Sequence, residues 1–238
     1  MEKIKQKDFI EIEFTGKVKD GDVFDSNIKE DLEEAKLNIK PKPFIFCVGE
    51  KMFLETIDDF LVEKEIGKKY EIELEPEKAF GKRNSNLVKI MPIKLFQKQQ
   101  TIPQPGMAFN FDGQIGKIIS VSGGRVITDF NNPLAGKTLV YNLKVKRKIT
   151  EQKEKASALI EFFTKTELPI EIKEKKLIVD ADERFAQFLN LFKDKFKEIL
   201  DLDLEVIDKS KEKKEVKEEE KKEEKKKDVN SKTPKLPQ

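Results

Sequence analysis

Alternation of apolar and polar residues is the feature that most constrains the fold of the first 149 residues. Ile10, Ile12 and Phe14 alternate with polar residues, and a period of two is the pattern of a strand with one buried face. The same alternation returns in three later runs: Phe44, Phe46 and Val48; Tyr70, Ile72 and Leu74; and Leu139, Tyr141, Leu143 and Val145. Only residues 55–62 suit a helix. We therefore predict an α+β fold, an antiparallel sheet with one short helix.

Residues 87–128 have a different texture, because three prolines and a second set of apolar positions fall among them. Within them, two β-branched runs flank Ser122-Gly123-Gly124, which predicts a tight hairpin. We interpret this segment as a small β unit of its own, inserted into the sheet. Residues 82–86 and 129–134 are then expected to be paired linkers, since the sheet resumes at Leu139.

After Arg147 the apolar residues follow the period of a helix, with Thr150 as its predicted N-cap. Two short alternating runs then indicate a hairpin around Glu174-Lys175. A second amphipathic helix is marked by an apolar stripe: Phe185, Phe188, Leu189, Phe192, Phe196 and Ile199. A last strand follows it. We predict an α-β-β-α-β domain at residues 150–207, so short that docking or dimerisation would add to its stability.

Lys and Glu dominate the chain from Asp208 onward. Such a segment has little apolar surface to bury against the entropy of ordering. We predict a charged, disordered tail at residues 208–238.

The composition excludes several kinds of site. There is no His, which removes the commonest general base and the usual zinc ligand, and we expect no metal site and no cofactor. A single Cys forms no internal disulfide and indicates a reducing compartment. With no signal-peptide pattern at residues 1–20 and no run of about 18 apolar residues, we expect a cytoplasmic protein without a membrane partner. Basic residues are interleaved with acidic ones, which argues against a nucleic-acid partner.

Three short runs carry most of the information about function: Phe14-Thr15-Gly16 with Asp20-Gly21 and Phe24-Asp25-Ser26; Lys42 to Gly49; and Asn132 to Leu139. In that order and spacing they resemble the FKBP family of peptidyl-prolyl isomerases. Ala79-Phe80-Gly81 lies where that family has Ala-Tyr-Gly. Residues 82–131 separate it from the closing strand, as in SlyD-type and long archaeal-type FKBPs with an inserted chaperone domain.

The resemblance implies four parts: an isomerase domain at residues 1–86 and 129–149, a chaperone insert at 87–128, a C-terminal α/β domain at 150–207 and the tail. It also implies an aromatic pocket that holds a proline ring while the preceding amide twists. The implied catalytic residues are Phe24, Asp25, Leu54, Phe80 and Tyr141, and the implied pocket residues are Phe14, Phe44, Phe53 and Ile57. By the resemblance, the backbone N–H of Leu54 donates to the substrate carbonyl and Asp25 lies beside the twisting amide.

Three departures from the family pattern lead us to expect reduced catalysis and weak macrolide binding. Phe80 lacks the hydroxyl of the usual Tyr, which removes a ligand hydrogen bond worth about 0.5–1.5 kcal/mol. Thr56 occupies the position of a common Gly, so the turn before the helix is expected to differ. Ile57 is a smaller pocket floor than the usual indole.

Comparison with SlyD-type proteins implies that the insert binds unfolded chains. The residues expected to form its exposed chaperone patch are Met107, Phe109, Phe111, Ile115, Ile118 and Ile119, more than so small a unit hides. The implied partners are unfolded or nascent polypeptides that contain proline. Because the C-terminal domain is short, a second copy of the chain bound through residues 150–207 is a further candidate partner.

Plainer interpretations stay open beside these. Isolated aromatics such as Phe24, Phe44 and Phe80 are more often core residues, and only their joint spacing favours a pocket. Asp25 judged alone is more often a turn-capping residue. Two other functions also remain: a holdase that has lost isomerase activity, and a structural adaptor in which residues 150–207 join two copies.

Overall fold

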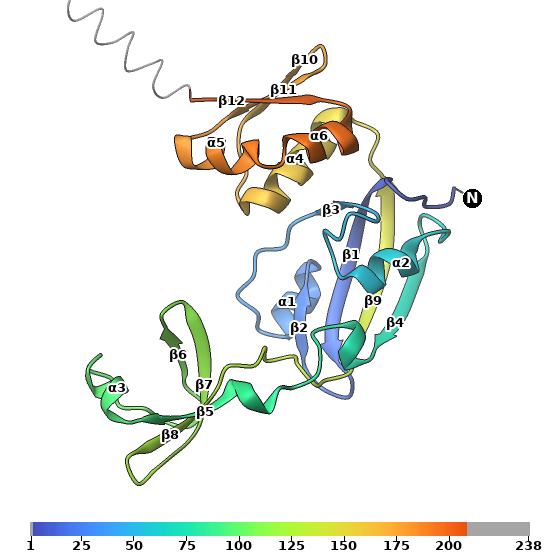
Figure 1. Ribbon diagram of the computed structural model, residues 1–238. Helices are drawn as coiled ribbons and strands as arrows, with labels where there is room; N and C mark the ends of the chain where they lie inside the picture. The colour runs from blue at the N-terminus through green and yellow to red at the C-terminus, as the bar shows by residue number, and fades with distance from the viewer. Residues whose placement is uncertain (1, 209–238) are drawn as a thin grey trace, which may run out of the picture. The chain divides into compact units, whose positions relative to one another are not determined.

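The computed structural model describes residues 2–208 (Figure 1). The described chain forms two compact units: residues 12–44 and 54–146, together with Glu2, make the first, and residues 3–11, 45–53 and 147–208 make the second. The predicted charged tail, apart from Asp208, lies outside the described residues. Within residues 2–208, no helix has the length and apolar character needed to cross a membrane.

Five strands form the main sheet, in the order β2-β1-β9-β4 with β3 beside β1. Their bounds are β1 Phe9–Val18, β2 Val23–Ser26, β3 Phe44–Cys47, β4 Lys69–Leu74 and β9 Leu139–Lys148. The pairs β1/β2 and β4/β9 are antiparallel. In β9 the alternate residues Leu139, Tyr141 and Leu143 are each at most 2% exposed. The strands predicted from alternation are thus confirmed.

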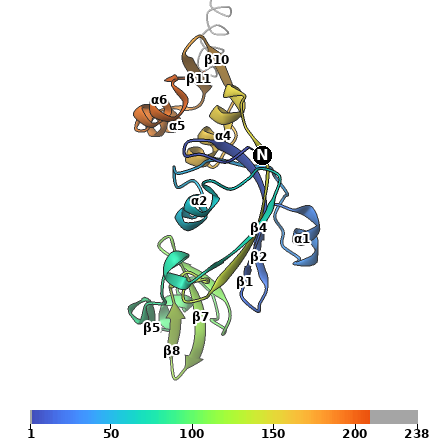
Figure 2. The same cartoon turned by 90° about the vertical axis from the view of Figure 1, so that its right-hand side faces the viewer.

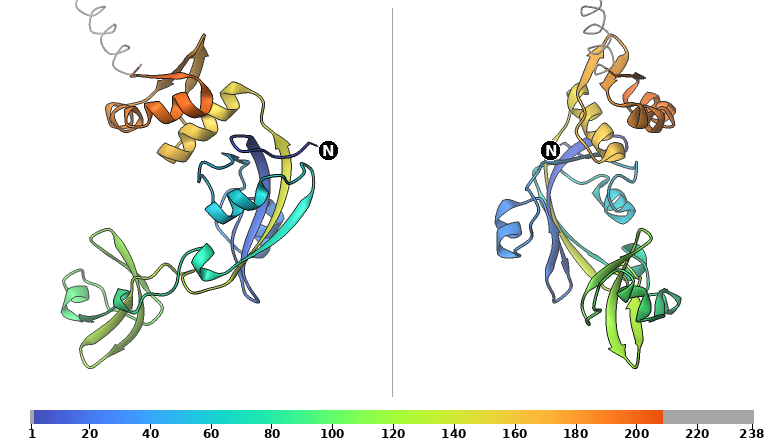
Figure 3. Two further views of the ribbon diagram at one scale, coloured as in Figure 1. Left: turned by 45° about the vertical axis from the view of Figure 1, so that its right-hand side comes forward. Right: turned by 90° about the vertical axis from the view of Figure 1, so that its left-hand side faces the viewer.

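Two helices accompany the main sheet: α1 (Lys29–Glu34) and α2 (Glu55–Leu61). They lie on opposite faces of the main sheet (Figures 2 and 3). The sequence predicted α2 within one residue, but the expectation of a single short helix was wrong. Helix α1 has six residues, of which only Leu32 is buried, so its sequence is too short to show a helical period. Two single 3-10 turns, Pro76–Lys78 and Ser85–Leu87, follow β4.

The insert forms a second sheet, in the order β5-β8-β7-β6. Its elements are β5 Val88–Pro92, α3 Lys94–Gln97, β6 Ala108–Phe111, β7 Gln114–Ser122 and β8 Arg125–Asp129. Gly123 (φ 54°) and Gly124 (φ 73°) make the predicted hairpin turn, since both central residues have positive φ. Phe96, Ile118 and Val126 form a buried core of this sheet alone.

The segments that lead into and out of the insert are hydrogen-bonded to each other, as predicted. The backbone N–H of Asn84 donates to Oδ1 of Asn131 (2.8 Å), and Nδ2 of Asn131 donates back to the carbonyl of Asn84 (3.0 Å). Arg83 forms an ion pair with Asp129. The two chain crossings are therefore held side by side at the base of the insert.

Residues 150–208 contain three helices and a three-stranded sheet of order β10-β11-β12. The elements are α4 Gln152–Thr164, β10 Ile170–Lys173, β11 Lys176–Asp180, α5 Glu183–Asn190, α6 Lys193–Leu200 and β12 Asp203–Ile207. The hairpin at Glu174 is confirmed, and β12 adds parallel to β11.

Two predictions for this part were wrong in detail. The stripe predicted as one helix is two, α5 and α6, because Phe192 (φ −109°, ψ 12°) leaves the helical conformation between them. The order is α-β-β-α-α-β. The N-cap of α4 is Glu151, in extended conformation and without a side-chain capping bond, and not Thr150.

Candidate active site

Four aromatic rings from four strands meet on the face of the main sheet opposite α1. Phe14 of β1 packs edge to face on Phe44 of β3, with ring centroids 5.6 Å apart. Tyr141 of β9 lies 6.5 Å from Phe14 and 5.8 Å from Phe24 of β2, the latter again edge to face. We call these four residues the aromatic cluster. Such offset geometries are the favourable ones for ring pairs.

Gly16 allows two of these rings to approach the backbone of β1. A Cβ at this position would lie 2.8 Å from Cζ of Phe24 and 2.9 Å from Cε1 of Tyr141. Gly16 pairs with Asp25 in the β1/β2 register. Gly16 is part of the Phe14-Thr15-Gly16 motif, but the sequence assigned it no role. Its role depends on the rings of Phe24 and Tyr141, which only the fold places over Gly16.

Ser26 and Asn27 hold the backbone of Phe14 in place. The N–H of Phe14 donates to Oδ1 of Asn27 (2.8 Å), and its carbonyl accepts from Oγ of Ser26 (2.9 Å). Nδ2 of Asn27 also donates to the carbonyl of Ile12 (2.8 Å). Ser26 Oγ also accepts from the N–H of Ile28 (3.0 Å), so Ser26 is a residue that caps this turn. The sequence reasoning did not assign a site role to either residue.

The carboxyl of Asp25 lies half-buried on β2 between Phe24 and Ser26. Burial raises the pKa of Asp25, and a hydrogen bond from the backbone N–H of Ser26 offsets part of that rise. Burial also raises the pKa of Tyr141, and the negative charge of Asp25 adds to the effect. The phenol therefore stays protonated at neutral pH. A carboxyl and a phenol thus face the same apolar surroundings.

Leu54, Ile57 and Phe80 are the other predicted residues of the first unit. Leu54 is the extended N-cap of α2, and its backbone N–H has no acceptor within residues 2–208. Ile57 is fully buried on α2, and Phe80 is half-buried after the Pro76–Lys78 turn. Thr56 lies inside α2 and not in the turn before it, and its Oγ1 donates to the carbonyl of Lys78 (2.9 Å).

Phe53 is the one predicted pocket residue that falls in the second unit. Its ring packs on Phe46 at 5.9 Å between centroids, and Phe46 is fully buried. Cys47 is fully buried, and its backbone N–H donates to the sulfur of Met52 (3.3 Å).

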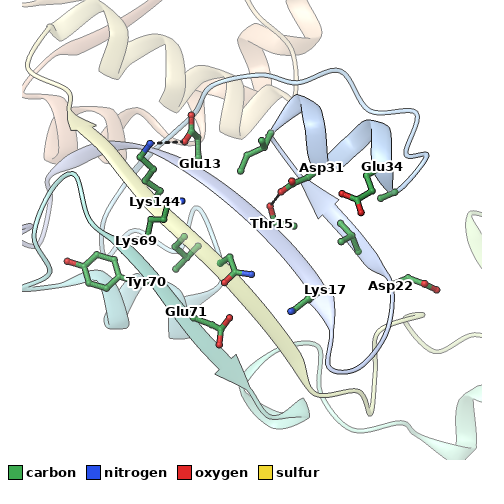
Figure 4. Close-up of a pocket in the computed structure, with 15 residues that line it drawn as sticks. Glu13, Thr15, Lys17, Asp22, Asp31, Glu34, Lys69, Tyr70, Glu71 and Lys144 are labelled. Atoms are coloured by element: carbon green, nitrogen blue, oxygen red, sulfur yellow. Dashed lines mark hydrogen bonds and ion pairs between the residues drawn. The ribbon is translucent and has the colours of Figure 1, made fainter.

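The face of the sheet beside α1 carries a different concavity, a cavity of about 980 Å³ (Figure 4). Its walls are mostly charged: Glu13 forms an ion pair with Lys144 (3.6 Å), and the Thr15 hydroxyl donates to Asp31. Lys146 holds the pKa of Glu13 below its ordinary value. None of the predicted site residues lines this cavity. We take the aromatic cluster as the candidate site, because a proline ring needs apolar walls.

Comparisons with known proteins decide the family. The chain is 32% identical over 146 residues to the short-type peptidyl-prolyl cis-trans isomerase of Methanocaldococcus jannaschii, a match that covers 60% of this chain and 92% of that protein. It is 26% identical over 149 residues to the FKBP-type 16 kDa peptidyl-prolyl cis-trans isomerase of Escherichia coli, covering 60% and 93%. The chain belongs to the FKBP-type peptidyl-prolyl cis-trans isomerases. Within this FKBP family, SlyD of Pasteurella multocida is 30% identical over 118 residues, but the match spans 48% of this chain and only 57% of that SlyD.

A family model described as "FKBP26, IF domain" matches residues 89–134, which include the strands of the insert. A solved structure, that of the three FKBP domains of wheat FKBP73, aligns with a TM-score of 0.35 and 16% sequence identity over 63% of this chain and 42% of that one. The resemblance inferred from the sequence motifs agrees with the isomerase relatives on the FKBP family.

The insert of this FKBP divides its predicted patch residues between core and surface. Ile118 is 1% exposed and belongs to the core, so its place in an exposed patch was wrong. Met107, Phe109 and Phe111 are half-buried against Phe96, whose ring lies 5.0 Å from Phe109 and 5.2 Å from Phe111. Ile115 (68%) and Ile119 (45%) are the exposed members. The sequence analysis missed four others: Leu87 (38%), Ile90 (66%), Leu95 (39%) and Ile102 (80%).

Proposed function

We propose that this FKBP catalyses cis–trans isomerisation of X-Pro bonds at the aromatic cluster, with the proline ring held against Phe14, Phe24, Phe44 and Tyr141. The observation that carries the proposal is the meeting of these four rings beside the Asp25 carboxyl. An X-Pro bond isomerises over tens to hundreds of seconds, because twisting the amide breaks its resonance at about 18–20 kcal/mol.

Catalysis needs a site that stabilises the twisted amide more than the planar one. The twisted form has lost resonance and carries less charge on its oxygen, so apolar walls that exclude water favour it over the planar amide. The N–H of Leu54, which has no acceptor among residues 2–208, supplies a donor that orients the substrate carbonyl, and Asp25 is the polar group beside the bond that turns. No bond breaks, so a chain without His can do this chemistry.

Exchange NMR of a Phe-Pro peptide tests the catalysis. We expect the protein to accelerate cis–trans exchange, and Phe24→Ala to reduce the acceleration at least tenfold because it removes one wall. Ile115→Ala, at an exposed position of the insert, is the control and should keep the wild-type acceleration. No acceleration above the spontaneous rate would refute the enzymatic proposal and leave the holdase as the surviving function.

We also propose that the insert binds unfolded or nascent chains and raises their concentration near the proline site. The match to an IF domain supports this, and so do the exposed Ile115 and Ile119 on a unit with its own core. Deletion of residues 88–128 should leave peptide turnover nearly unchanged and impair catalysed refolding of a protein. Equal losses in both assays would contradict this division of labour.

Neighbouring isoleucines give a sharper test of the insert. Ile119→Ala should weaken binding of a reduced, unfolded protein and leave the insert's stability unchanged, because its side chain is exposed. Ile118→Ala should destabilise the insert by about 2–5 kcal/mol, because its side chain is buried in the core. If Ile119→Ala binds the unfolded protein as tightly as the wild type, β7 is not part of the binding surface.

A second copy of the chain is the partner we propose for the C-terminal helices. Phe188 and Leu191 are 39% and 78% exposed at the junction of α5 and α6. Beside that junction, a groove of about 330 Å³ is lined by Phe162, Phe163 and Phe192 among others. Light scattering should give a dimer mass for the wild type and a monomer mass for Leu191→Glu and for a chain ending at Thr150. A monomeric wild type would end this proposal.

We propose a cytoplasmic location for this FKBP. Its single Cys, Cys47, is buried and fits a reducing compartment. Fractionation of cells that express the tagged full chain checks this, and recovery in the membrane or secreted fraction would refute it.

A further inference from the structure

The segment that carries Phe80 has its shape fixed by local hydrogen bonds. After β4, the N–H of Ala79 donates to the carbonyl of Pro76 (3.1 Å), and so does the N–H of Gly81 (2.7 Å). Gly81 has φ +78°, which suits glycine. We call residues 75–81 the Phe80 loop. These bonds lie within the loop and do not fix where it lies relative to α2.

One hydrogen bond described above joins the Phe80 loop to α2. Oγ1 of Thr56 donates to the carbonyl of Lys78, the last residue of the 3-10 turn (2.9 Å). Carbonyls at the end of a helical turn lack a partner within the turn, and this one takes its donor from a side chain. Thr56 lies two residues after Leu54, in the first turn of α2. The bond therefore ties the loop to the helix end that presents the Leu54 N–H.

The same bond links Thr56 to the loop that carries Phe80, and these are two of the three positions where the chain departs from the FKBP motif. Thr replaces the common Gly at position 56, and Phe replaces the Tyr of Ala-Tyr-Gly at position 80. A glycine has no side chain to make this bond. Thr56 is helical, so the position accepts a β-branched residue without backbone strain.

We propose that Thr56 is a positioning residue of the proline site: its hydroxyl holds the Phe80 loop against α2, in the conformation in which Phe80 forms a wall for substrate. This inference rests on the proposed isomerase function and on the pocket role that the FKBP motif implies for Phe80. Thr56 itself has no part in the chemistry. Its loss would leave the loop in the binding-competent conformation only part of the time, and apparent affinity falls in proportion to that fraction.

A matched set of variants tests the role of the hydroxyl. Thr56→Val removes the donor and keeps the shape, whereas Thr56→Ser keeps the donor. Thr101→Val is the control, because it removes a comparable bond from a Thr hydroxyl to a carbonyl, that of Gln99, within the insert. With a Phe-Pro peptide we expect Thr56→Val to raise KM about fivefold with kcat changed less than twofold, and Thr56→Ser and Thr101→Val to match the wild type.

A second readout reports the loop directly. With ¹³C-labelled phenylalanine, and Phe80 assigned through Phe80→Leu, its ring resonance should move in Thr56→Val and stay in place in Thr56→Ser. An unchanged KM, an unmoved resonance, or equal changes in the Val and Ser variants would overturn the proposal. If the wild type shows no turnover, the proposed function is refuted instead. The Phe80 resonance alone would then test the positioning role of Thr56: movement in Thr56→Val but not in Thr56→Ser would support it.

Discussion

Gly16→Ala is the substitution that most directly tests the aromatic cluster. Its methyl would lie 2.8 Å from Phe24 Cζ and 2.9 Å from Tyr141 Cε1, whereas carbon atoms in contact are ordinarily about 3.5–4.0 Å apart. Both rings must therefore recede by about 1 Å. The φ of Gly16 lies outside the left-handed region, so the backbone accepts alanine and the effect is purely steric.

We expect this overpacking to lower the free energy of unfolding by about 1–3 kcal/mol. A displacement of about 1 Å at a catalytic wall costs on the order of 100-fold in rate, so kcat/KM should fall by 10- to 100-fold. Urea unfolding followed by tyrosine fluorescence isolates the main sheet. The chain has no Trp, and its two tyrosines, Tyr70 and Tyr141, lie on β4 and β9.

A double-mutant cycle separates the steric reason from other causes. Phe24→Leu removes the Cζ atom that the new methyl would meet, so the double variant should be less destabilised than the sum of the single variants by about 0.5–2 kcal/mol. Gly21→Ala, whose methyl meets Val18 and no ring of the cluster, should keep turnover. Additive effects within about 0.3 kcal/mol, or wild-type turnover in Gly16→Ala, would refute the reasoning.

Three further predictions concern pH, the backbone at Phe14 and the base of the insert. Because burial raises the pKa of Asp25 above its ordinary 3.8, the folded chain binds its proton more tightly than the unfolded chain, and the ionised group destabilises the fold above that pH. Asp25→Asn should therefore raise Tm at pH 7, with the gain vanishing below about pH 4; a gain that does not change with pH would contradict this. Ser26→Ala should lower the free energy of unfolding by about 1 kcal/mol in the tyrosine-monitored urea experiment, since the Phe14 carbonyl loses one donor; no change would show that this bond is not stabilising. Asn131→Ala removes both bonds to Asn84 and should speed hydrogen exchange throughout the insert with peptide turnover unchanged, whereas unchanged exchange would mean that the pair does not hold the base together.

Local pattern was sufficient for the strands and the insert hairpin. An alternation of apolar and polar residues can be recognised in only four or five residues. Two consecutive glycines between such runs commonly form a tight hairpin turn. The same reasoning failed where position in the fold outweighs pattern. Ile118 and Ile119 are the same residue type, but successive residues of a strand point to opposite faces of the sheet, so Ile118 lies in the core while Ile119 is exposed.

The candidate site was predictable to the extent that it depends on residue type. Aromatic residues at motif spacing indicated Phe14, Phe24, Phe44 and Tyr141, and the fold brings their rings together. What the side chains do to one another was not predictable. The close approach over Gly16 joins positions more than 100 residues apart, and no property of a single strand encodes it.

One face of strand β1 carries the aromatic cluster and the other the charged cavity, and the Ser26 hydroxyl lies near groups on both. Its Oγ lies 2.9 Å from the carbonyl of Phe14 on the aromatic side and 3.2 Å from Oγ1 of Thr15 on the charged side. Each hydroxyl has one proton to donate. The Thr15 proton goes to Asp31, and the Ser26 proton goes to the Phe14 carbonyl. If Thr15 lost Asp31, its proton could turn to Ser26 Oγ, and the Ser26 proton would still hold Phe14. Loss of the Thr15–Asp31 hydrogen bond in the charged cavity should therefore leave the hydrogen bond from Ser26 to the Phe14 backbone intact.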